Sequence, residues 1–513
     1  MEESRRKNTT LSMITSGIRQ VSSILLQFVS RTVFIYILGK EYLGLNGLFT
    51  NILTLLALSE LGIGVAITYY LYSPLASNDK ERIKTLMRFY RKCYNVVGLV
   101  IFLVGCSIMP FLNKLVNFDQ PLPENLYIVY LLFLLQSACT YFFFAYKQSL
   151  ITADQKLYKV EKINIVFIFL GCLVDVVVLL IFRSFMPYLV FKVALIILKN
   201  LCIALKVDKE YPFIKEPCEN ELTKEEVRHF FKDVYSVSVF KIGSVFLNSL
   251  SNFIISIMIG TAFVGVYSNY TLITTQVSAV FMIFITSVTA SVGNVLAKET
   301  KERQQDIFNK LRVYCYVICA VFTIAIFQLS NSFINIWLGG LDKTYIFPQA
   351  AVLFISLDFY VNSYCQIHNT FRQASGNFKI GQYLQFFGGA ANLALAIPLC
   401  NLFGIVGVFA AQVISKFAIT NIPFLYMIER KLFNVEIKDT IYIVIKDLGI
   451  TLLLFLCTWF ICNDFHETSI KNFVLEIVIT LSIPLAVYCF VFRKTEAFGE
   501  VKQYISIFIN KNK

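Results

Sequence analysis

The stretch QVSSILLQFVSRTVFIYILGKEYLG, residues 20–44, decides the fold because it returns as KIGSVFLNSLSNFIISIMIGTAFVG at residues 241–265. The polar positions and glycines of the two stretches correspond at a constant offset of 221 residues: Gln20/Lys241, Ser23/Ser244, Gln27/Asn248, Ser30/Ser251, Arg31/Asn252, Gly39/Gly260 and Gly44/Gly265. The same offset relates the tripeptide Lys-Glu-Arg at 80–82 to its copy at 301–303. An apolar helix with a polar stripe that occurs twice is typical of a cavity wall built from two repeats.

The composition is that of an integral membrane protein. Of 513 residues, 57% are hydrophobic and only 15% are charged, and the mean hydropathy is +0.66. Apolar runs of about 20 residues recur along the chain, which indicates helical spans rather than a barrel. We expect an all-α polytopic membrane protein with about fourteen spans, near 11–38, 43–73, 93–113, 125–147, 161–183, 186–206, 234–260, 263–296, 311–338, 346–371, 378–400, 404–429, 441–462 and 472–492.

Lysine and arginine placement predicts the orientation. Alternate connecting segments and the two tails hold 35 of these residues, whereas the opposite loops hold five. Positive charge stays on the cytoplasmic side, so we expect both termini in the cytoplasm and an even number of spans. This bias also accounts for the net charge of +13, and we expect no nucleic-acid partner.

The repeat covers six spans, an even number, so both halves have the same predicted orientation. This predicts two six-helix lobes related by a pseudo-twofold axis along the membrane normal. We assign 1–206 to the N-terminal lobe, 207–233 to a cytoplasmic linker, 234–429 to the C-terminal lobe, and 430–513 to two accessory helices and a cytoplasmic tail.

Ten ionisable residues lie within the predicted spans: Arg19, Arg31, Glu60, Asp175, Lys192, Lys199, Lys241, Asp358, Lys416 and Glu476. We interpret Lys192 and Glu476, near span ends, as snorkelling side chains. The others are costly in hydrocarbon and indicate a water-filled cavity or ion pairs.

Polar residues at spacings of three and four share one helical face. Interhelical hydrogen bonding would explain the Ser and Asn residues of such stripes but explains the basic residues poorly. A cationic cavity suits an anion, because Arg and Lys bind phosphate oxygens. The predicted substrate-binding residues are Arg19, Gln20, Gln27, Arg31, Lys241, Asn248, Asn252 and Lys416. The predicted ion-coupling carboxylates are Glu60, Asp175 and Asp358, since a carboxylate near bases can change protonation state.

Several signatures of other classes are missing from the sequence. There is no GxxxxGK[ST] motif for nucleotide binding. No CxxC pair occurs, and the thirteen cysteines are interpreted as reduced, small hydrophobic residues. The predicted non-cytoplasmic loops are short. We therefore expect a protein that is not an enzyme and has no cofactor and no metal site.

The segments LGKEYLGLNGLF (38–49), LSELGIG (58–64) and LYSPLA (71–76) resemble the Wzx-type flippases of bacterial surface-polysaccharide synthesis. These belong to the multidrug/oligosaccharidyl-lipid/polysaccharide exporter (MOP) superfamily. The resemblance involves specific residues over the first two spans. Over the rest of the chain it consists only of the same predicted arrangement of two six-helix lobes and two additional helices.

The resemblance implies an alternating-access flippase of the bacterial cell membrane. Its substrate would be a polyprenyl-diphosphate-linked oligosaccharide, and its other partners would be membrane lipids, protons or sodium, and a polysaccharide polymerase. In such flippases a cationic lumen holds the head group, and the last two helices are associated with a lipid groove.

Two other classes stay open at the level of sequence. A cation-coupled multidrug exporter of the same superfamily would have a more acidic interior than the six basic and four acidic residues found here. A non-transporting assembly factor would not require a polar stripe in both halves.

Overall fold

The computed structural model describes residues 2–56, 63, 67, 70–71, 74–75, 77–116, 124–143, 145–154, 156–217, 220–375, 377, 379–462 and 469–492. Every regular element in these ranges is a helix. The all-helical membrane architecture expected from the sequence is confirmed. The chain folds into two compact units, Met1–Gly265 and Val266–Lys513.

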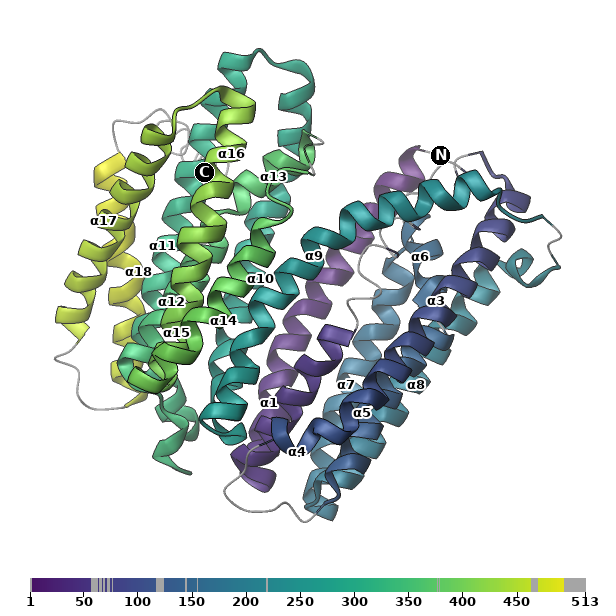
Figure 1. The fold of residues 1–513 in the computed structure, drawn as a ribbon, viewed down its shortest axis with the longest axis horizontal. Helices are drawn as coiled ribbons and strands as arrows, with labels where there is room; N and C mark the ends of the chain where they lie inside the picture. The colour runs from purple at the N-terminus through teal and green to yellow at the C-terminus, as the bar shows by residue number, and fades with distance from the viewer. Residues whose placement is uncertain are drawn as a thin grey trace, which may run out of the picture. The chain divides into compact units, whose positions relative to one another are not determined.

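The first unit is built around long helices that run side by side (Figure 1). Helix α1 packs on α7, α3 packs on α5, and α8 packs on both α5 and α7. Its helices are α1 (Glu2–Leu56), α3 (Lys80–Ile108), η2 (Met109–Phe111), α4 (Leu112–Leu115), α5 (Leu126–Phe143), α6 (Ala145–Ala153), α7 (Tyr158–Phe182), α8 (Phe185–Glu210), η3 (Pro212–Lys215) and α9 (Lys224–Met258). Helix α10 (Thr261–Lys298) begins in this unit and continues into the second.

The second unit packs its helices around α11, which contacts α12, α17 and α18. Buried aromatic side chains such as Tyr316, Tyr364 and Phe371 form its core. Its helices are α11 (Lys301–Leu338), η4 (Lys343–Tyr345), α12 (Gln349–Tyr364), α13 (Gln366–Ala374), α14 (Leu384–Phe403), α15 (Ile405–Ile414), the π-helix η5 (Ser415–Asn421), α16 (Ile422–Phe433), α17 (Ile437–Cys462) and α18 (Ile470–Phe492).

The 221-residue offset reappears in the helix starts. Helices α3 and α11 begin at Lys80 and Lys301, the first residues of the two Lys-Glu-Arg copies. The residue before each copy caps its helix: the Asp79 side chain accepts from the Arg82 amide, and Thr300 accepts from the Arg303 amide. The side chains differ, but both supply the oxygen that an N-cap requires.

The offset also relates breaks between helices. Gly39 and Gly260 both have positive φ angles, 83° and 141°, and each lies at a change of helix direction or a helix boundary. Arg183 and Gly404 follow the ends of α7 and α14, with φ angles of 49° and 58°. The repeat detected at 20–44 therefore extends over most of each half.

Two equivalent glycines pack against each other. A methyl group on Gly44 would lie 2.0 Å from the Thr261 carbonyl oxygen, and one on Gly265 would lie 2.4 Å from the Lys40 carbonyl oxygen. Lys40 and Thr261 are themselves related by 221 residues, so the contact is reciprocal. These positions require glycine because the backbones of α1 and α10 approach too closely for a Cβ atom.

Among the described residues, eleven helices are long and apolar enough to cross a membrane, or twelve if the bent pair formed by α5 and α6 is one span. The predicted spans 11–38 and 43–73 share α1, which changes direction at Gly39, and most of 57–73 lies outside the described residues. The predicted span 234–260 falls on α9, whose apolar part, Ile242–Met258, is shorter. The lobe boundaries 1–206, 207–233, 234–429 and 430–513 stay predictions.

Candidate functional site

The first unit contains two adjoining cavities between α1, α7 and α8, with volumes of about 340 and 400 Å³. The residues that line both are Ser23, Phe167, Ile168, Gly171, Asp175 and Lys192. Space of this size between membrane helices can hold a polar head group.

The polar stripe predicted on the first span faces these cavities. Ser23, Gln27, Ser30 and Arg31 line the 340 Å³ cavity, and Arg19 lines the 400 Å³ cavity. They share one face because they follow the spacing of three and four residues expected for a helix. Gln20, the remaining predicted member of this stripe, is half-buried on α1 but lines neither cavity.

Basic side chains outnumber acidic ones at the cavity walls. Asp175 interacts with the Ser30 hydroxyl and with Lys192. Lys192 donates to the Tyr188 hydroxyl at 2.6 Å, and its ammonium lies 4.9 Å from the centre of the Tyr188 ring. The interpretation of Lys192 as a snorkelling side chain stays a prediction; in the structure Lys192 lines both cavities, and its amine is bound by Tyr188. Arg31 and Lys199 add further positive charge to the lining.

Arg19 has a strong acidic partner. Its Nε atom lies 2.7 Å from Oε2 of Glu161 on α7. Glu161 is buried and was not recognised in the sequence, because it lies at the boundary of a predicted span and resembles a loop residue there. The pair joins α1 to α7, so the charge of Arg19 is largely compensated within the protein.

In the second unit, the predicted ion-coupling residue Asp358 and the predicted substrate-binding residue Lys416 form an ion pair. Lys416 Nζ lies 2.6 Å from Asp358 Oδ1, and Lys416 is only 2% exposed. Gln412 and Asn362 also donate to the carboxylate, at 3.2 and 3.0 Å. Lys416 belongs to the π-helix η5, a local widening of the helix that is frequent at functional sites.

A small cavity of about 80 Å³ adjoins this pair. Asp358, Asn362 and Gln412 contribute to its lining, together with Tyr267, Thr274 and Ser278. Lys416 does not contribute to it, because its ammonium is turned to the carboxylate. The structure therefore brings these two predicted residues together as a nearly neutral unit rather than as an open cationic wall.

The remaining predicted residues are not brought into these cavities. Asn248 is exposed on α9 and donates at 2.7 Å to the Ser244 carbonyl of the same helix. Asn252 is half-buried on α9, and neither it nor Asn248 lines the described cavities. Lys241 lies on α9, but its side chain is outside the described residues, as is the whole of Glu60.

Two further polar clusters were missed by the sequence analysis. Glu429 on α16 binds His368 Nε2 at 2.9 Å and the Thr440 hydroxyl at 2.5 Å. Arg312 lies 3.6 Å from the same carboxylate. In the first unit, Lys147 binds Asp208 at 2.6 Å. Glu429 and Asp208 both lie near helix ends that are rich in charged residues. From the sequence alone they therefore look like ordinary solvent-exposed side chains.

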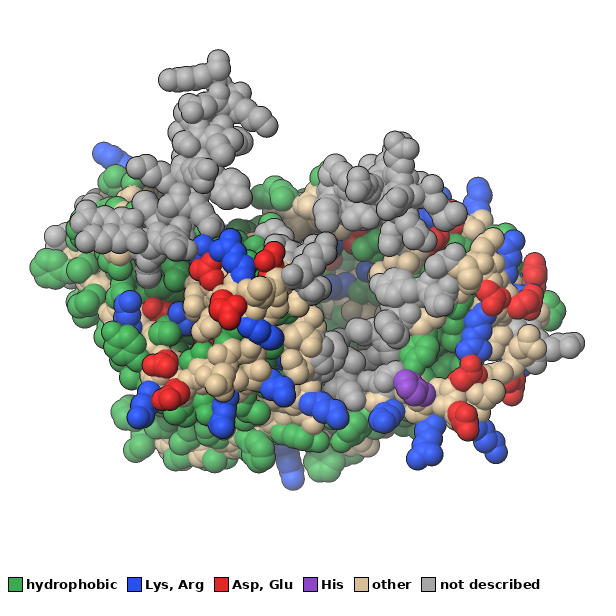
Figure 2. Space-filling view, turned by 90° about the horizontal axis from the view of Figure 1, so that it is seen from above, with side chains coloured by type: hydrophobic (Ala, Val, Ile, Leu, Met, Phe, Trp, Pro, Cys, Tyr) green, Lys and Arg blue, Asp and Glu red, His purple; other side chains and the backbone are tan. Residues whose placement is uncertain are grey.

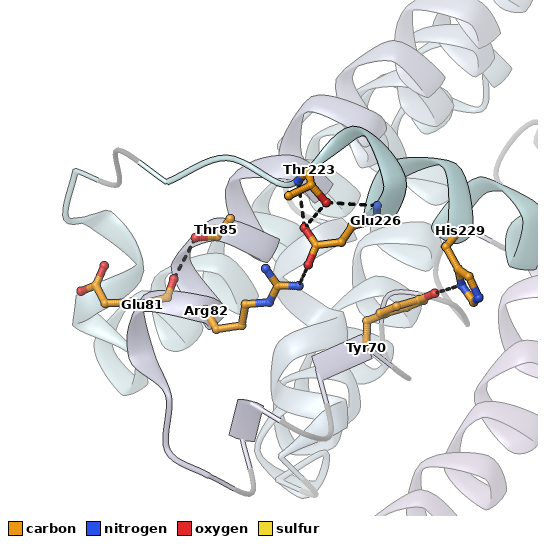
Figure 3. Close-up of polar contacts among 7 residues, drawn as sticks. All are labelled: Tyr70, Glu81, Arg82, Thr85, Thr223, Glu226 and His229. Atoms are coloured by element: carbon orange, nitrogen blue, oxygen red, sulfur yellow. Dashed lines mark hydrogen bonds and ion pairs between the residues drawn. The ribbon is translucent and has the colours of Figure 1, made fainter.

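The first Lys-Glu-Arg copy also makes a tertiary contact. Arg82 forms an ion pair with Glu226, which closes a capping box with Thr223 at the start of α9 (Figure 3). The hydrogen bond from the Thr223 amide, reinforced by the Arg82 guanidinium, lowers the pKa of the Glu226 carboxyl. In the same view the Tyr70 hydroxyl lies 3.0 Å from His229 Nδ1. Figure 2 shows basic and acidic side chains next to one another on the face seen from above.

No protein-family model matches the sequence, and no curated protein is significantly similar to it. Solved structures do resemble the fold. A lipid II flippase, MurJ, in an inward closed conformation superimposes with a TM-score of 0.66 and 15% identity, covering 94% of this chain and 99% of MurJ. An inward-facing multidrug resistance MATE family transporter of the MOP superfamily has a TM-score of 0.61 and 14% identity, covering 82% and 98%.

The fold is that of the MOP-superfamily transporters. A Vibrio cholerae MATE transporter agrees, with a TM-score of 0.57 and 12% identity over 85% of this chain and 99% of its own. These neighbours are transporters and a flippase, not enzymes. The superfamily expected from the sequence is thus the one whose fold is found, whereas identities of 12–15% carry no information on the substrate.

Proposed function

We propose that this protein is a flippase for polyprenyl-diphosphate-linked oligosaccharides in the bacterial cell membrane. It would move repeat units from the cytoplasmic to the outer leaflet for surface-polysaccharide synthesis, with both termini in the cytoplasm. The observation that carries this proposal is the lining of the two adjoining cavities between α1, α7 and α8. Arg31, Lys192 and Lys199 contribute to it, and Asp175 is the one acidic residue of the lining.

The chemistry of the cavity suits a diphosphate. The planar guanidinium of Arg31 can bind two phosphate oxygens at once, while Lys192 and Lys199 act as mobile point charges. Ser23, Gln27 and Asn164 offer additional hydrogen bonds to hydroxyl-rich sugars. In a medium of low dielectric constant these charges attract an anion more strongly than they would in water.

Ion coupling is assigned to carboxylates that face bases. Asp175 interacts with Lys192, and Asp358 with Lys416. Binding of a proton or sodium ion at either carboxylate would release a neighbouring ammonium, and so would change the local positive charge. Alternating access by two lobes, 1–206 and 234–429, remains part of the same proposal.

A cation-coupled multidrug exporter is the second candidate. The observation in its favour is the 80 Å³ cavity beside Asp358, whose lining includes Tyr267, Phe354 and Phe409. A carboxylate with aromatic neighbours can hold an organic cation. Lys416 already neutralises this carboxylate at 2.6 Å, so the flippase is the preferred function.

Replacement of Arg31 tests the proposal. The Arg31→Gln variant should lose at least about tenfold in surface-polysaccharide export, and lipid-linked oligosaccharide should accumulate in the cell, because one charge-assisted phosphate contact is worth about 1.5–3 kcal/mol. Lys162→Gln is the matched control, since Lys162 lies on α7 and lines neither cavity. Normal export by Arg31→Gln would contradict the proposal, and dye efflux that depends on Asp358 would favour the exporter.

A further inference from the structure

A third cavity lies in the first unit, among residues from the helix ends that the lysine and arginine distribution places on the cytoplasmic side. Its volume is about 630 Å³, within the range of ligand sites. It is formed by α3, α6, α8 and η3. Its charged lining consists of five basic residues, Lys84, Arg88, Arg91, Lys147 and Lys215, and two acidic ones, Asp208 and Glu216.

The two acidic residues are engaged by lysines. Asp208 bridges Lys147 at 2.6 Å and Lys215 at 3.1 Å. Glu216 lies 3.2 Å from Lys84, which also binds Glu81 at 2.6 Å. Each acidic residue of the lining is thus paired with at least one lysine ammonium.

Two arginines complete the charged lining of the cavity. Arg88 and Arg91 are exposed, and a spacing of three residues places them on the same face of α3. Arg91 has no acidic partner in the part of the chain that the structure describes, and Arg88 lies near Glu221, which is not part of the lining. The cavity therefore carries excess positive charge at its open side.

The second unit holds a copy of part of this site at the 221-residue offset. Arg91, Lys147 and Asp208 correspond to Arg312, His368 and Glu429. In both units the basic side chain contacts the acidic one: Lys147 lies 2.6 Å from Asp208, and His368 lies 2.9 Å from Glu429. The Lys147–Asp208 and His368–Glu429 contacts thus tie the ends of neighbouring helices together in both units.

The copy in the second unit is closed. Phe308, which corresponds to Met87, packs edge-on against the His368 ring with centroids 5.0 Å apart. Thr440 of α17 donates to Glu429, and His368 is 1% exposed. Its acidic partner Glu429 is likewise buried, with 3% of its surface exposed.

The open cavity of the first unit carries basic residues that its closed copy in the second unit lacks. Three basic residues of the open cavity, Lys84, Arg88 and Lys215, correspond to Gln305, Asn309 and Glu436 in the closed copy. The closed copy shows that the helix ends pack without these cations. The helix ends that the two copies share therefore do not require these cations in order to pack.

We propose that the 630 Å³ cavity binds a phosphate-bearing ligand, with Arg88 and Arg91 as its principal contacts and Lys84, Lys147 and Lys215 as supporting charges. Clustered arginines and lysines around a concave surface are the usual phosphate-binding arrangement in proteins. The phosphate can come from a soluble molecule or from the head group of an anionic lipid. This site is separate from the cavity between α1, α7 and α8 and does not rest on the flippase assignment.

The test compares Arg88→Gln/Arg91→Gln with Lys92→Gln in the purified full chain. Lys92 follows Arg91 on α3, is exposed, and does not line the cavity. Pyrophosphate binding is measured by calorimetry in a neutral detergent. Retention of phosphatidylglycerol is measured by native mass spectrometry after purification from nanodiscs that contain equal phosphatidylglycerol and phosphatidylcholine. Thermal unfolding checks that the exposed substitutions leave the fold intact.

Each outcome has a defined meaning. A loss of pyrophosphate affinity of about tenfold or more in the double variant, with Lys92→Gln unchanged, supports the site with a soluble ligand. Absence of pyrophosphate binding, with phosphatidylglycerol retained by the wild type and the control but lost from the double variant, supports it with a lipid ligand. If the double variant matches the wild type in both assays, or if the wild type binds neither probe, the proposal is overturned.

Discussion

The two units place charge within the membrane in different ways. In the first, Arg31, Asp175 and Lys192 surround an open cavity. In the second, Asp358 and Lys416 form an ion pair in which the lysine is buried. The two halves therefore share their arrangement of helices but not the positions of their charged residues.

The positions of the charges make this difference concrete. Asp175 and Lys192 correspond to Ala396 and Val413 in the second half, whereas Asp358 and Lys416 correspond to Ser137 and Leu195 in the first. Each charge thus has an uncharged counterpart at the 221-residue offset. Specialisation of each unit after duplication explains this pattern better than a shared structural requirement.

The largest expected effect comes from breaking the buried pair. Asp358→Leu should destabilise the protein by about 3–5 kcal/mol, because the buried Lys416 ammonium is left without its counter-charge. Asp175→Asn is the matched substitution in the first unit. It should cost less than about 1 kcal/mol, since Lys192 faces an open cavity and retains Tyr188.

Thermal and denaturant unfolding in detergent measure both changes. The double variant Asp358→Leu/Lys416→Met should recover most of the lost stability, because replacing both ions with apolar groups removes the penalty. Equal losses for Asp358→Leu and Asp175→Asn would show that the two units do not differ in this respect.

Substitutions at the reciprocal glycine contact test whether Gly44 and Gly265 are equivalent in the two repeats. Gly44→Ala and Gly265→Ala should each destabilise the protein by about 1–3 kcal/mol, since the new methyl groups meet backbone oxygens at 2.0 and 2.4 Å. Gly17→Ala on α1 is the control, because nothing lies within 4 Å of its added Cβ atom. Tolerance of alanine at one position but not the other would break the equivalence.

The closed copy around Glu429 should be destabilised when the Thr440 hydroxyl is removed. Thr440→Val should cost about 1–3 kcal/mol, because the buried Glu429 carboxylate loses a hydrogen bond. Urea unfolding and hydrogen exchange of α16 and α17 would measure this loss. Lys438→Gln on the same helix is exposed and should leave both unchanged, whereas an unaltered Thr440→Val variant would show that α17 does not stabilise the closed state.

The smallest effect concerns the two Lys-Glu-Arg copies. Arg82 reaches across to Glu226 on α9, whereas Arg303 binds Asp306 of its own helix at 2.7 Å. The lowered pKa of Glu226 stabilises the protein above the ordinary Glu pKa of about 4.3, and this contribution is lost as the pH falls through the lower folded-state pKa.

Glu226→Gln should therefore lower stability near neutral pH by at most about 1 kcal/mol and reduce its decline under acid conditions. Unfolding midpoints between pH 3 and pH 7 measure this difference. Asp306→Asn provides the comparison in the second unit, where the pair lies within one helix. A steeper acid decline in Glu226→Gln than in the wild type would contradict the sign of the predicted linkage.

Much of the first unit's cavity could be predicted from the sequence. Ser23, Gln27, Ser30 and Arg31 follow helical periodicity, and a polar stripe in an apolar helix has few stable environments other than a cavity or a polar interface. Asn248 and Asn252 follow the same periodicity but do not line the described cavities. The period of a stripe indicates which residues share a face, but not what that face contacts.

Partners distant in sequence could not be predicted. Glu161 neutralises Arg19 from another helix, and Asp358 neutralises Lys416 across 58 positions of sequence. Both basic residues resemble free cations in the sequence because nothing local identifies their carboxylates. The ion pairs that decide the net charge of each site depend on the packing of α1 against α7 and of α12 against η5.

The membrane class, the helical architecture and the duplication could be predicted from the sequence alone, because hydropathy and helical periodicity are local properties that the lipid environment enforces. Which of the basic side chains line a cavity depends on the tertiary packing. Arg31, Arg88 and Lys416 look alike as isolated basic residues, yet the first two line cavities and the third is buried on Asp358. The difference arises from which helices pack together, and that depends on side-chain fit between segments far apart in the chain.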